Sequence, residues 1–247
     1  MRTIRAAFRF LSFAALTFGL YAIWFVADPF VRNKRHWRQM IFGAWTNSFV
    51  RISRMTVEVT GTPPTPPFFL VTNHLSYTDI GAIRAVVKGV FVAKREIENW
   101  FLAGRIVRDM GTIFIDRGNR RDIPRAGEKI IERLDHGEGV IVFPEGTSTK
   151  GDEVLPFNSS FFEFAAQSGL PVSYASISYR TPTGEPTAST VSWWDETGFF
   201  AHIWRLFKVR EYTAVISFGD EPILNSDRKQ LAKELQRQVA KSFVPVK

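Results

Sequence analysis

The sequence predicts an α/β fold: a mostly parallel sheet flanked by helices, with an N-terminal membrane-associated helical segment. From residue 55 onward, short apolar runs alternate with helix-like amphipathic segments, which is typical of parallel strands joined by crossover helices. The runs 68–71 and 139–142 contain no charged or polar side chain, as expected of strands buried on both faces. An uncharged stretch from Phe10 to Ala27 predicts a helix that precedes this sheet.

Composition narrows the class of partner. The chain has 247 residues, 45% of them hydrophobic, so it can bury the core of one domain. It has no cysteine, which excludes disulfides, thiolate metal sites and a cysteine nucleophile. A formal charge of +8 predicts an anionic partner, either nucleic acid or acidic lipid headgroups, unless the protein is merely basic and soluble. The 23 Phe and 7 Trp lie mainly in apolar segments, which favours a membrane surface over nucleic acid.

The stretch Phe10–Ala27 is at the short end of what crosses a bilayer. Basic residues flank it on both sides, namely Arg2, Arg5 and Arg9 before it and Arg32, Lys34, Arg35 and Arg38 after it. Charge on both flanks gives no orientation across the membrane. One explanation is that both ends lie on the same cytoplasmic face and the segment dips into one leaflet; a helix that spans the membrane is the alternative. The apolar positions of residues 37–52 predict a second, interfacial amphipathic helix. A cleaved signal peptide is the alternative, but no small-x-small cleavage site follows.

We therefore divide the chain into a membrane-associated helical segment, 1–54, and a catalytic domain, 55–247, joined near the proline-rich connector 61–67. The expected strands are 55–60, 68–72, 90–93, 112–115, 140–143, 172–178 and 213–218. The expected helices are 79–88, 99–110, 123–136, 157–167, 199–207 and 226–243, with a polar loop at 181–190. The aromatic helix 199–207 is expected in the core, with a second membrane contact as the alternative.

A polar cluster, Asn73-His74-Leu75-Ser76-Tyr77-Thr78-Asp79, follows the first buried strand. On a continuous helix His74 and Asp79 would be about 140° apart, so they can meet only if the chain turns between them. A helix that starts after such a turn would favour an ionised Asp79 in its first turn. Asp79 could then orient the imidazole of His74 and leave its second nitrogen free to remove a proton. A structural histidine that caps a turn is the alternative.

A second cluster, Phe143-Pro144-Glu145-Gly146-Thr147-Ser148, follows another predicted strand. Gly146 allows the backbone to approach a ligand, and neighbouring amides can face an anion. Glu145 can hold a ligand hydroxyl or be an exposed turn acid. At a third strand exit, Arg117 could anchor a phosphate or pair with Asp116 or Asp122. Ligands collect at the carboxyl ends of strands in such sheets, so we expect one site here.

Taken in order, these motifs resemble the glycerolipid acyltransferases typified by 1-acylglycerol-3-phosphate acyltransferase. The first block, Asn-His-x4-Asp, is matched by Asn73, His74 and Asp79, and the second by Gly111 to Arg117. The third, Phe-Pro-Glu-Gly-Thr, is matched by Phe143 to Thr147, and a weaker fourth by Leu170-Pro171-Val172. The resemblance covers about residues 68 to 180.

The resemblance implies an O-acyltransferase that needs no metal or cofactor and forms no covalent acyl-enzyme. His74 would deprotonate the hydroxyl of a lysolipid, which attacks the thioester of acyl-carrier protein or acyl-CoA, while Asp79 orients His74. Asn73, Arg117, Glu145, Gly146 and Thr147 would bind substrate. The implied location is the cytoplasmic face of the inner (plasma) membrane, and the implied product with 1-acylglycerol-3-phosphate is phosphatidate.

One position departs from the pattern. Many lysophosphatidate enzymes carry arginine where this chain has Ser148, which weakens the case for a phosphomonoester acceptor. The segment 154–160 is similar to relatives that acylate other lysolipids, including lyso-ornithine lipid. A thioesterase and a non-catalytic membrane-binding lipid module remain the alternatives from other functional classes.

Overall fold

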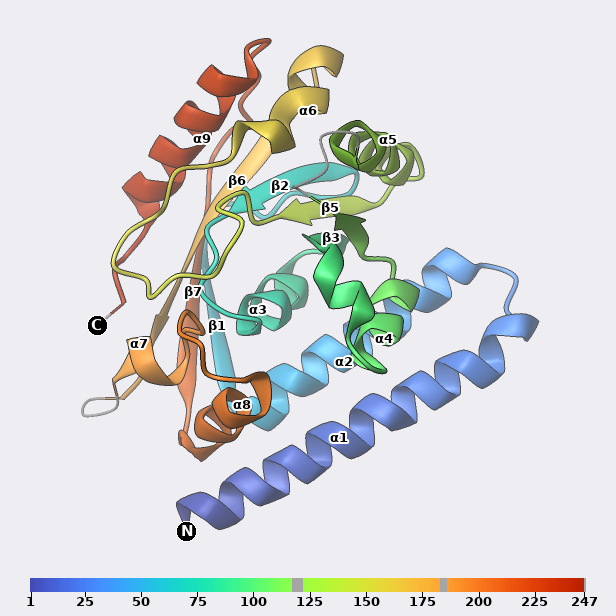
Figure 1. The fold of residues 1–247 in the computed structure, drawn as a ribbon, viewed down its shortest axis with the longest axis vertical. Helices are drawn as coiled ribbons and strands as arrows, with labels where there is room; N and C mark the ends of the chain where they lie inside the picture. Colours follow the sequence, from blue (N-terminus) through green and yellow to red (C-terminus); the bar gives the residue numbers. More distant parts are fainter. Residues whose placement is uncertain (117–121, 183–185, 247) are drawn as a thin grey trace.

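The structure, a computed structural model of the 247-residue chain, describes residues 1–116, 122–182 and 186–246. Within these residues, seven strands form one sheet in the order β1-β7-β6-β2-β5-β3-β4. The strands are β1 (Met55–Thr60), β2 (Phe68–Thr72), β3 (Gly89–Lys94), β4 (Ile113–Ile115), β5 (Gly139–Val142), β6 (Val172–Arg180) and β7 (Tyr212–Phe218). All neighbouring pairs are parallel except β6 and β7. The predicted mostly parallel α/β sheet is therefore confirmed (Figure 1).

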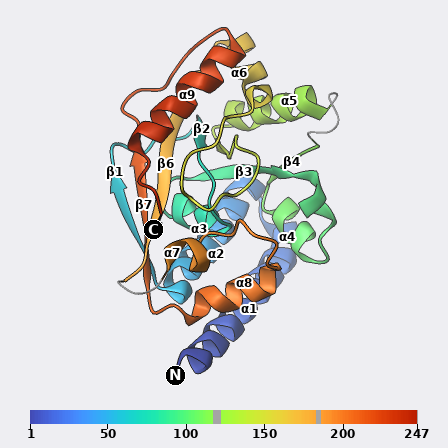
Figure 2. The same ribbon diagram turned by 60° about the vertical axis from the view of Figure 1, so that its left-hand side comes forward.

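Helices cover both faces of the sheet (Figures 1 and 2). They are α1 (Arg2–Ala27), α2 (Lys34–Ser53), α3 (Thr78–Val86), α4 (Ala103–Asp109), α5 (Asp122–Asp135), α6 (Glu163–Ser168), α7 (Thr187–Thr190), α8 (Phe199–Lys208) and α9 (Arg228–Ser242), with 3-10 turns η1 (Asp28–Phe30), η2 (Arg95–Asn99) and η3 (Ser159–Phe162). Strand β2 shows the two-sided burial: Phe68 and Leu70 face the core shared with α2 and α3, whereas Phe69 and Val71 face the core shared with α5 and α9. This explains why the first four positions of the strand are all apolar.

Three local expectations were wrong. The helix expected at 99–110 is broken at Trp100-Phe101-Leu102 into η2 and α4, and Leu102 has a φ of 57°. The helix expected at 157–167 begins only after η3. The polar loop 181–190 contains the short helix α7. The first two errors fall where hydrophobic periodicity continues across a local change of backbone conformation, which periodicity does not record. The four residues of α7, TAST, carry no apolar pattern that could have revealed the third.

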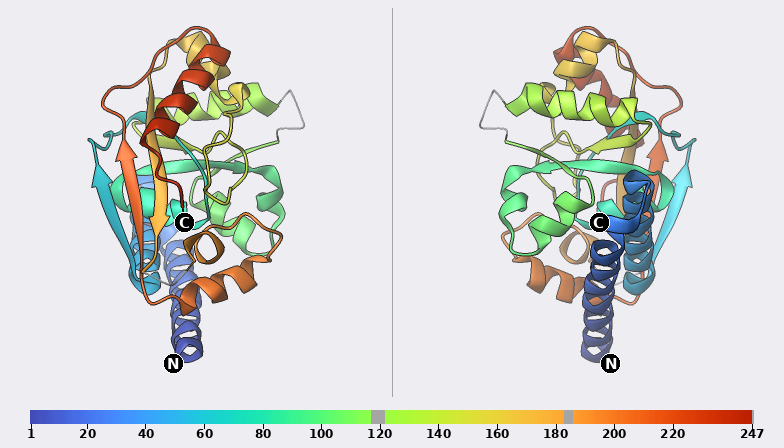
Figure 3. Two further views of the ribbon diagram at one scale, coloured as in Figure 1. Left: turned by 90° about the vertical axis from the view of Figure 1, so that its left-hand side faces the viewer. Right: turned by 90° about the vertical axis from the view of Figure 1, so that its right-hand side faces the viewer.

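The first two helices form an antiparallel hairpin at the base of the molecule (Figure 3). One side of α1 is anchored to the rest of the protein: the Arg9 guanidinium donates to the carbonyls of Val209 at 2.6 Å and Arg210 at 2.9 Å, just past the end of α8. Tyr21 donates to Asp109 at 2.7 Å. The other side carries exposed large apolar side chains along its length, including Ile4, Phe8, Leu11, Phe18 and Phe25.

Helix α2 was expected to be an interfacial amphipathic helix, but its apolar side packs on the sheet. Its Ile41, Phe42 and Phe49 belong to the same apolar core as residues of β2, β3 and β5. The division at residue 54 into a membrane-associated segment and a catalytic domain coincides with the passage from α2 to β1, and it stays a prediction.

Candidate active site

Strand register places the two sequence clusters side by side. Strands β2 and β5 run parallel, with Phe69 opposite Val140 and Val71 opposite Val142. The residues that follow each strand, beginning at Asn73 and at Phe143, therefore leave the same edge of the sheet. A backbone hydrogen bond from the Thr149 amide to the His74 carbonyl, 2.9 Å long, joins the two loops.

His74 and Asp79 meet across a tight turn. The imidazole Nδ1 of His74 lies 2.7 Å from Oδ2 of Asp79, so the predicted contact is present. The same carboxylate oxygen accepts from the backbone amides of Leu75 at 2.8 Å and Ser76 at 3.1 Å. The turn is thus built around the Asp79 carboxylate, which lies in the first turn of α3 and is fully buried.

The geometry fixes which nitrogen of His74 can act as a base. Asp79 accepts through Oδ2, so Nδ1 carries the proton and Nε2 has a lone pair. Nε2 has no hydrogen-bond partner among the described residues, and 21% of the side chain is exposed. The ring stacks on Phe143, with centroids 4.0 Å apart and planes 17° apart. The imidazole is therefore held in one orientation with one nitrogen open to a ligand.

Glu145 is tied to the backbone of the histidine loop. Its carboxylate accepts from the His74 amide at 2.8 Å and from the Leu155 amide at 3.2 Å. Burial outweighs these two donors, which favour the ionised form, and raises the pKa of Glu145 to about 8. Glu145 is therefore half-buried and joins two loops through its carboxylate. The alternative of an exposed turn acid was wrong.

The remaining glycine-turn residues lie beside Glu145. Gly146 has a φ of 83°, and its amide donates to the Phe143 carbonyl at 3.1 Å. This left-handed conformation explains the glycine. Thr147 is exposed at the rim, with its hydroxyl 3.4 Å from the Ser148 carbonyl.

Asn73, expected to bind substrate, is buried and bonded to the protein backbone. It is 1% exposed, its amide nitrogen donates to the Ile177 carbonyl at 2.9 Å, and its oxygen accepts from the Ile177 amide at 2.8 Å. These two bonds extend the pairing of β2 with β6 beyond the end of the strand. Its side chain therefore holds the loop and does not face the open nitrogen of His74.

Arg117 lies outside the described residues. Asp122, one of its possible partners, accepts from Arg95 through both carboxylate oxygens at 2.8 Å, and its Oδ2 accepts from the Asp116 amide at 2.7 Å. These bonds lower the pKa of Asp122 below its usual value.

Comparison with known proteins identifies the family of this chain. The model of the Acyltransferase family matches residues 54–178. The chain belongs to the acyltransferase family. Within this acyltransferase, the matched segment begins just before β1 and ends in β6, so it contains every residue described in the preceding paragraphs as part of the two loops.

The acyltransferase has relatives with two different names. It is 33% identical over 149 residues to a 1-acyl-sn-glycerol-3-phosphate acyltransferase of Neisseria gonorrhoeae, covering 60% of this chain and 58% of the relative. It is 31% identical over 203 residues to a lyso-ornithine lipid O-acyltransferase of Pseudomonas aeruginosa, covering 82% of this chain and 78% of the relative. The crystal structure of the Thermotoga maritima 1-acyl-sn-glycerophosphate acyltransferase PlsC has the same fold, with a TM-score of 0.69 at 23% identity over 98% of this chain and 97% of that one.

Sequence reasoning missed Tyr179, which the fold brings to the turn between His74 and Asp79. Its hydroxyl donates to Oδ1 of Asp79 at 2.6 Å and accepts from the Thr78 hydroxyl at 3.0 Å. Burial and the neighbouring carboxylate raise the pKa of Tyr179 well above its usual value. Tyr179 lies near the end of β6, a hundred positions from Asp79 in the chain. No local pattern links the two.

A second missed group supports the turn from outside. His202 on α8 is fully buried, with Nδ1 3.0 Å from the Tyr77 hydroxyl and Nε2 2.9 Å from the Ser192 carbonyl. Burial lowers the pKa of His202 to about 4. Next to it, the Trp193 amide donates to the Leu75 carbonyl at 2.8 Å. The segment 192–202 therefore braces the turn that carries His74 and Asp79.

Ser148 belongs to the same brace. Its hydroxyl donates to the Trp193 carbonyl. The position at which the sequence departs from the resembled pattern is thus occupied by a short side chain that bonds to the backbone of Trp193.

Proposed function

We propose that this protein is an O-acyltransferase that moves a fatty acyl chain from an acyl-carrier protein or acyl-CoA thioester to the free hydroxyl of a lysolipid. The observation that carries the proposal is the His74–Asp79 contact at 2.7 Å, together with an Nε2 that has no partner in the part of the chain that the structure describes. A histidine held in this way accepts a proton at Nε2, and the adjacent carboxylate stabilises the imidazolium that forms.

The reaction needs only the two substrates. The lysolipid hydroxyl gives its proton to Nε2 of His74 as its oxygen forms a bond to the thioester carbonyl carbon. The tetrahedral species then expels the thiol, the carbon–sulfur bond breaks, and the sulfur takes the proton back from Nε2. The products are an ester and a free thiol, and the imidazole returns neutral. Positioned acid–base catalysis of this kind contributes about 10² to 10⁴-fold.

We assign the remaining predicted site residues to two tasks. Asn73 and Glu145 position the histidine loop, because their polar atoms bond to backbone at Ile177, His74 and Leu155. Gly146 and Thr147 form the rim over which the acceptor enters. Arg117 remains our prediction for the anchor of an acceptor phosphate.

For the acceptor we propose 1-acylglycerol-3-phosphate, giving phosphatidate. Lyso-ornithine lipid is the second candidate, because two observations favour it. The arginine position of lysophosphatidate enzymes is occupied by Ser148, whose hydroxyl turns to the Trp193 backbone. The relative named for lyso-ornithine lipid aligns with 82% of this chain, against 60% for the relative named for the glycerophosphate acceptor.

We place the enzyme on the cytoplasmic face of the inner (plasma) membrane. The helix Arg2–Phe30 is long and apolar enough to cross a membrane by length and composition. However, Arg9 is buried and bonded to carbonyls beyond α8, and a crossing helix would lose these bonds. We therefore propose that α1 lies in one leaflet, with its exposed apolar face in the lipid.

The test is a direct acceptor comparison. Purified protein would be given acyl-CoA or acyl-carrier protein with lysophosphatidate, with lyso-ornithine lipid, or with no acceptor, and the products separated by mass. Ester formation with either lysolipid supports the proposal. Release of fatty acid without an acceptor identifies a thioesterase, and no turnover with any pair identifies a non-catalytic lipid-binding module; either result overturns it.

A further inference from the structure

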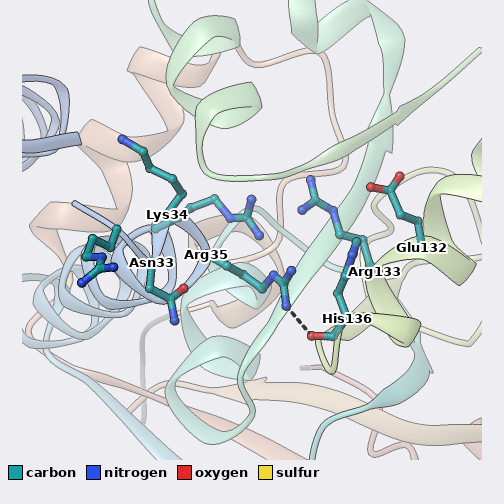
Figure 4. Close-up of a pocket in the computed structure, with 8 residues that line it drawn as sticks. Asn33, Lys34, Arg35, Glu132, Arg133 and His136 are labelled. Atoms are coloured by element: carbon teal, nitrogen blue, oxygen red, sulfur yellow. Dashed lines mark hydrogen bonds between the residues drawn. The ribbon is translucent and has the colours of Figure 1, made fainter. Parts of the chain in front are cut away.

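A basic cleft lies at the opposite edge of the sheet from His74. It has a volume of about 590 Å³ and is lined by Arg32, Asn33, Lys34, Arg35 and Arg38 at the start of α2 and by Glu132, Arg133 and His136 at the end of α5 (Figure 4). His136 is three residues before Gly139, where β5 begins. The cleft therefore belongs to the amino ends of the strands, whereas the His74–Asp79 pair lies beyond their carboxyl ends.

Positive charge exceeds negative charge in this cleft. Glu138 behind it accepts from both Arg38 and Arg133, and Lys34 pairs with Asp28 at 3.0 Å. Arg35 donates to the uncharged carbonyl of His136 at 2.7 Å.

Among the described residues, neither Arg32 nor Arg35 has a carboxylate partner within 4.0 Å, and both are exposed. Two guanidinium groups are therefore left to pair with an anion, and guanidinium matches phosphate oxygens in a bidentate manner.

The start of α2 adds to this field. The helix has 20 residues, and Asn33 caps it by accepting from the His36 amide at 3.0 Å. The amino end of a helix carries partial positive charge that favours an anion nearby. The helix end strengthens the binding of a negative group whose main partners are the arginines.

The apolar face of the hairpin ends close to the cleft along the chain. Phe25, Val26 and Phe30 are exposed large apolar side chains at the end of α1 and in η1. Arg32 follows Phe30 by two residues, so their backbones are at most about 7 Å apart. Aromatic side chains next to arginine are typical of the level in a membrane where acyl chains meet phosphate groups.

We propose that this cleft binds the phosphate headgroup of an anionic membrane lipid, at a site separate from the catalytic pair. Phe25, Val26 and Phe30 enter the acyl region, and Arg32 and Arg35 hold the phosphate above them. This site would fix the turn between α1 and α2 on the bilayer and give the protein a preference for anionic membranes. Binding of this kind does not depend on acyl transfer.

The test compares two variants of equal charge change. Arg32→Glu/Arg35→Glu alters the cleft, and Lys233→Glu/Arg237→Glu alters two exposed cations on α9, which contributes no residue to the cleft. Binding to vesicles of phosphatidylcholine with and without phosphatidylglycerol is measured by co-sedimentation. We expect the cleft variant to lose about 10- to 30-fold in affinity for phosphatidylglycerol vesicles, the α9 variant less than about 3-fold, and neither to change on pure phosphatidylcholine.

Three results would overturn the proposal. Equal losses in both variants would mean that overall charge, not the cleft, attracts the membrane. Inorganic phosphate could also abolish the difference in phosphatidylglycerol binding between the wild type and the cleft variant. That result would mean that the cleft binds a free anion. Competition by soluble acyl-carrier protein that the cleft variant abolishes would mean a protein-docking surface. Vesicle binding is measured without turnover, so the two proposals are tested separately. A cleft variant that binds vesicles normally contradicts only the lipid site, and an absence of acyl transfer contradicts only the proposed function.

Discussion

The carboxylate of Asp79 is the part of the site whose removal is easiest to interpret. It accepts four hydrogen bonds, from His74 Nδ1, the amides of Leu75 and Ser76, and the Tyr179 hydroxyl. Asp79→Asn keeps the shape and one acceptor oxygen. That oxygen can stay beneath Leu75, Ser76 and His74 if the new amide nitrogen faces the Tyr179 hydroxyl. The substitution therefore removes charge while leaving the turn a way to form.

The magnitude follows from the contact. A hydrogen bond to a charged group contributes about 1.5 to 3 kcal/mol, and opposite charges about 4 Å apart attract by about 4 kcal/mol at an effective dielectric constant of 20. Only the imidazolium formed during the reaction gains this attraction, so the loss falls on kcat. We expect Asp79→Asn to lower kcat by about 10² to 10³-fold with little change in KM.

The assay measures steady-state acyl transfer to the preferred lysolipid, with thermal unfolding to confirm that the variant folds. Asp135→Asn makes the same chemical change at an exposed residue at the end of α5 and should retain full activity. A folded Asp79→Asn enzyme with the kcat of the wild type would refute the reasoning, because the His74 imidazole would then need no neighbouring charge.

Three further predictions concern residues around the turn. Tyr179→Phe removes one donor to Asp79 and should lower kcat about 10-fold at constant KM. The control Tyr212→Phe removes a buried hydroxyl bonded to Ser53 and should leave kcat unchanged. Equal kcat values in the two variants would contradict this prediction. The pKa of Glu145 is raised from 4.5 to about 8, so the folded state holds a proton that the unfolded state has lost. As pH rises from about 5 to 8, the wild type should therefore lose up to about 5 kcal/mol of stability relative to Glu145→Gln. A free energy of unfolding that varies with pH in the same way in both proteins would contradict this. The pKa of His202 is lowered from 6.5 to about 4, so the wild type should lose about 3 kcal/mol of stability relative to His202→Gln as pH drops from 6.5 to 4; a constant difference between the two proteins in urea unfolding would contradict this.

Local sequence predicted the parts of the fold that depend on burial. Strand β2 is apolar at four successive positions because both faces are covered, and this made the strand and its polar exit visible in the sequence. The turn between His74 and Asp79 was predictable because two residues five positions apart cannot face each other on a helix.

Other parts of the site depend on strand order, which local sequence does not encode. Strand β6 lies next to β2, and this places Tyr179 against Asp79 and Ile177 against Asn73. From local sequence alone we expected Asn73 to bind substrate. In the structure its side-chain amide instead joins β2 to β6. Glu145 has two backbone partners that come from separate loops, and only the folded chain brings them together.

The central claim is that Nε2 of His74 removes the proton of the lysolipid hydroxyl. The most direct measurement is single-turnover transfer of a labelled acyl chain by His74→Ala, with vesicle binding recorded on the same preparation. We predict that the variant still binds vesicles and forms ester at least about 10²-fold more slowly than the wild type. Ester formation at the wild-type rate by a folded, vesicle-bound His74→Ala protein would contradict the account.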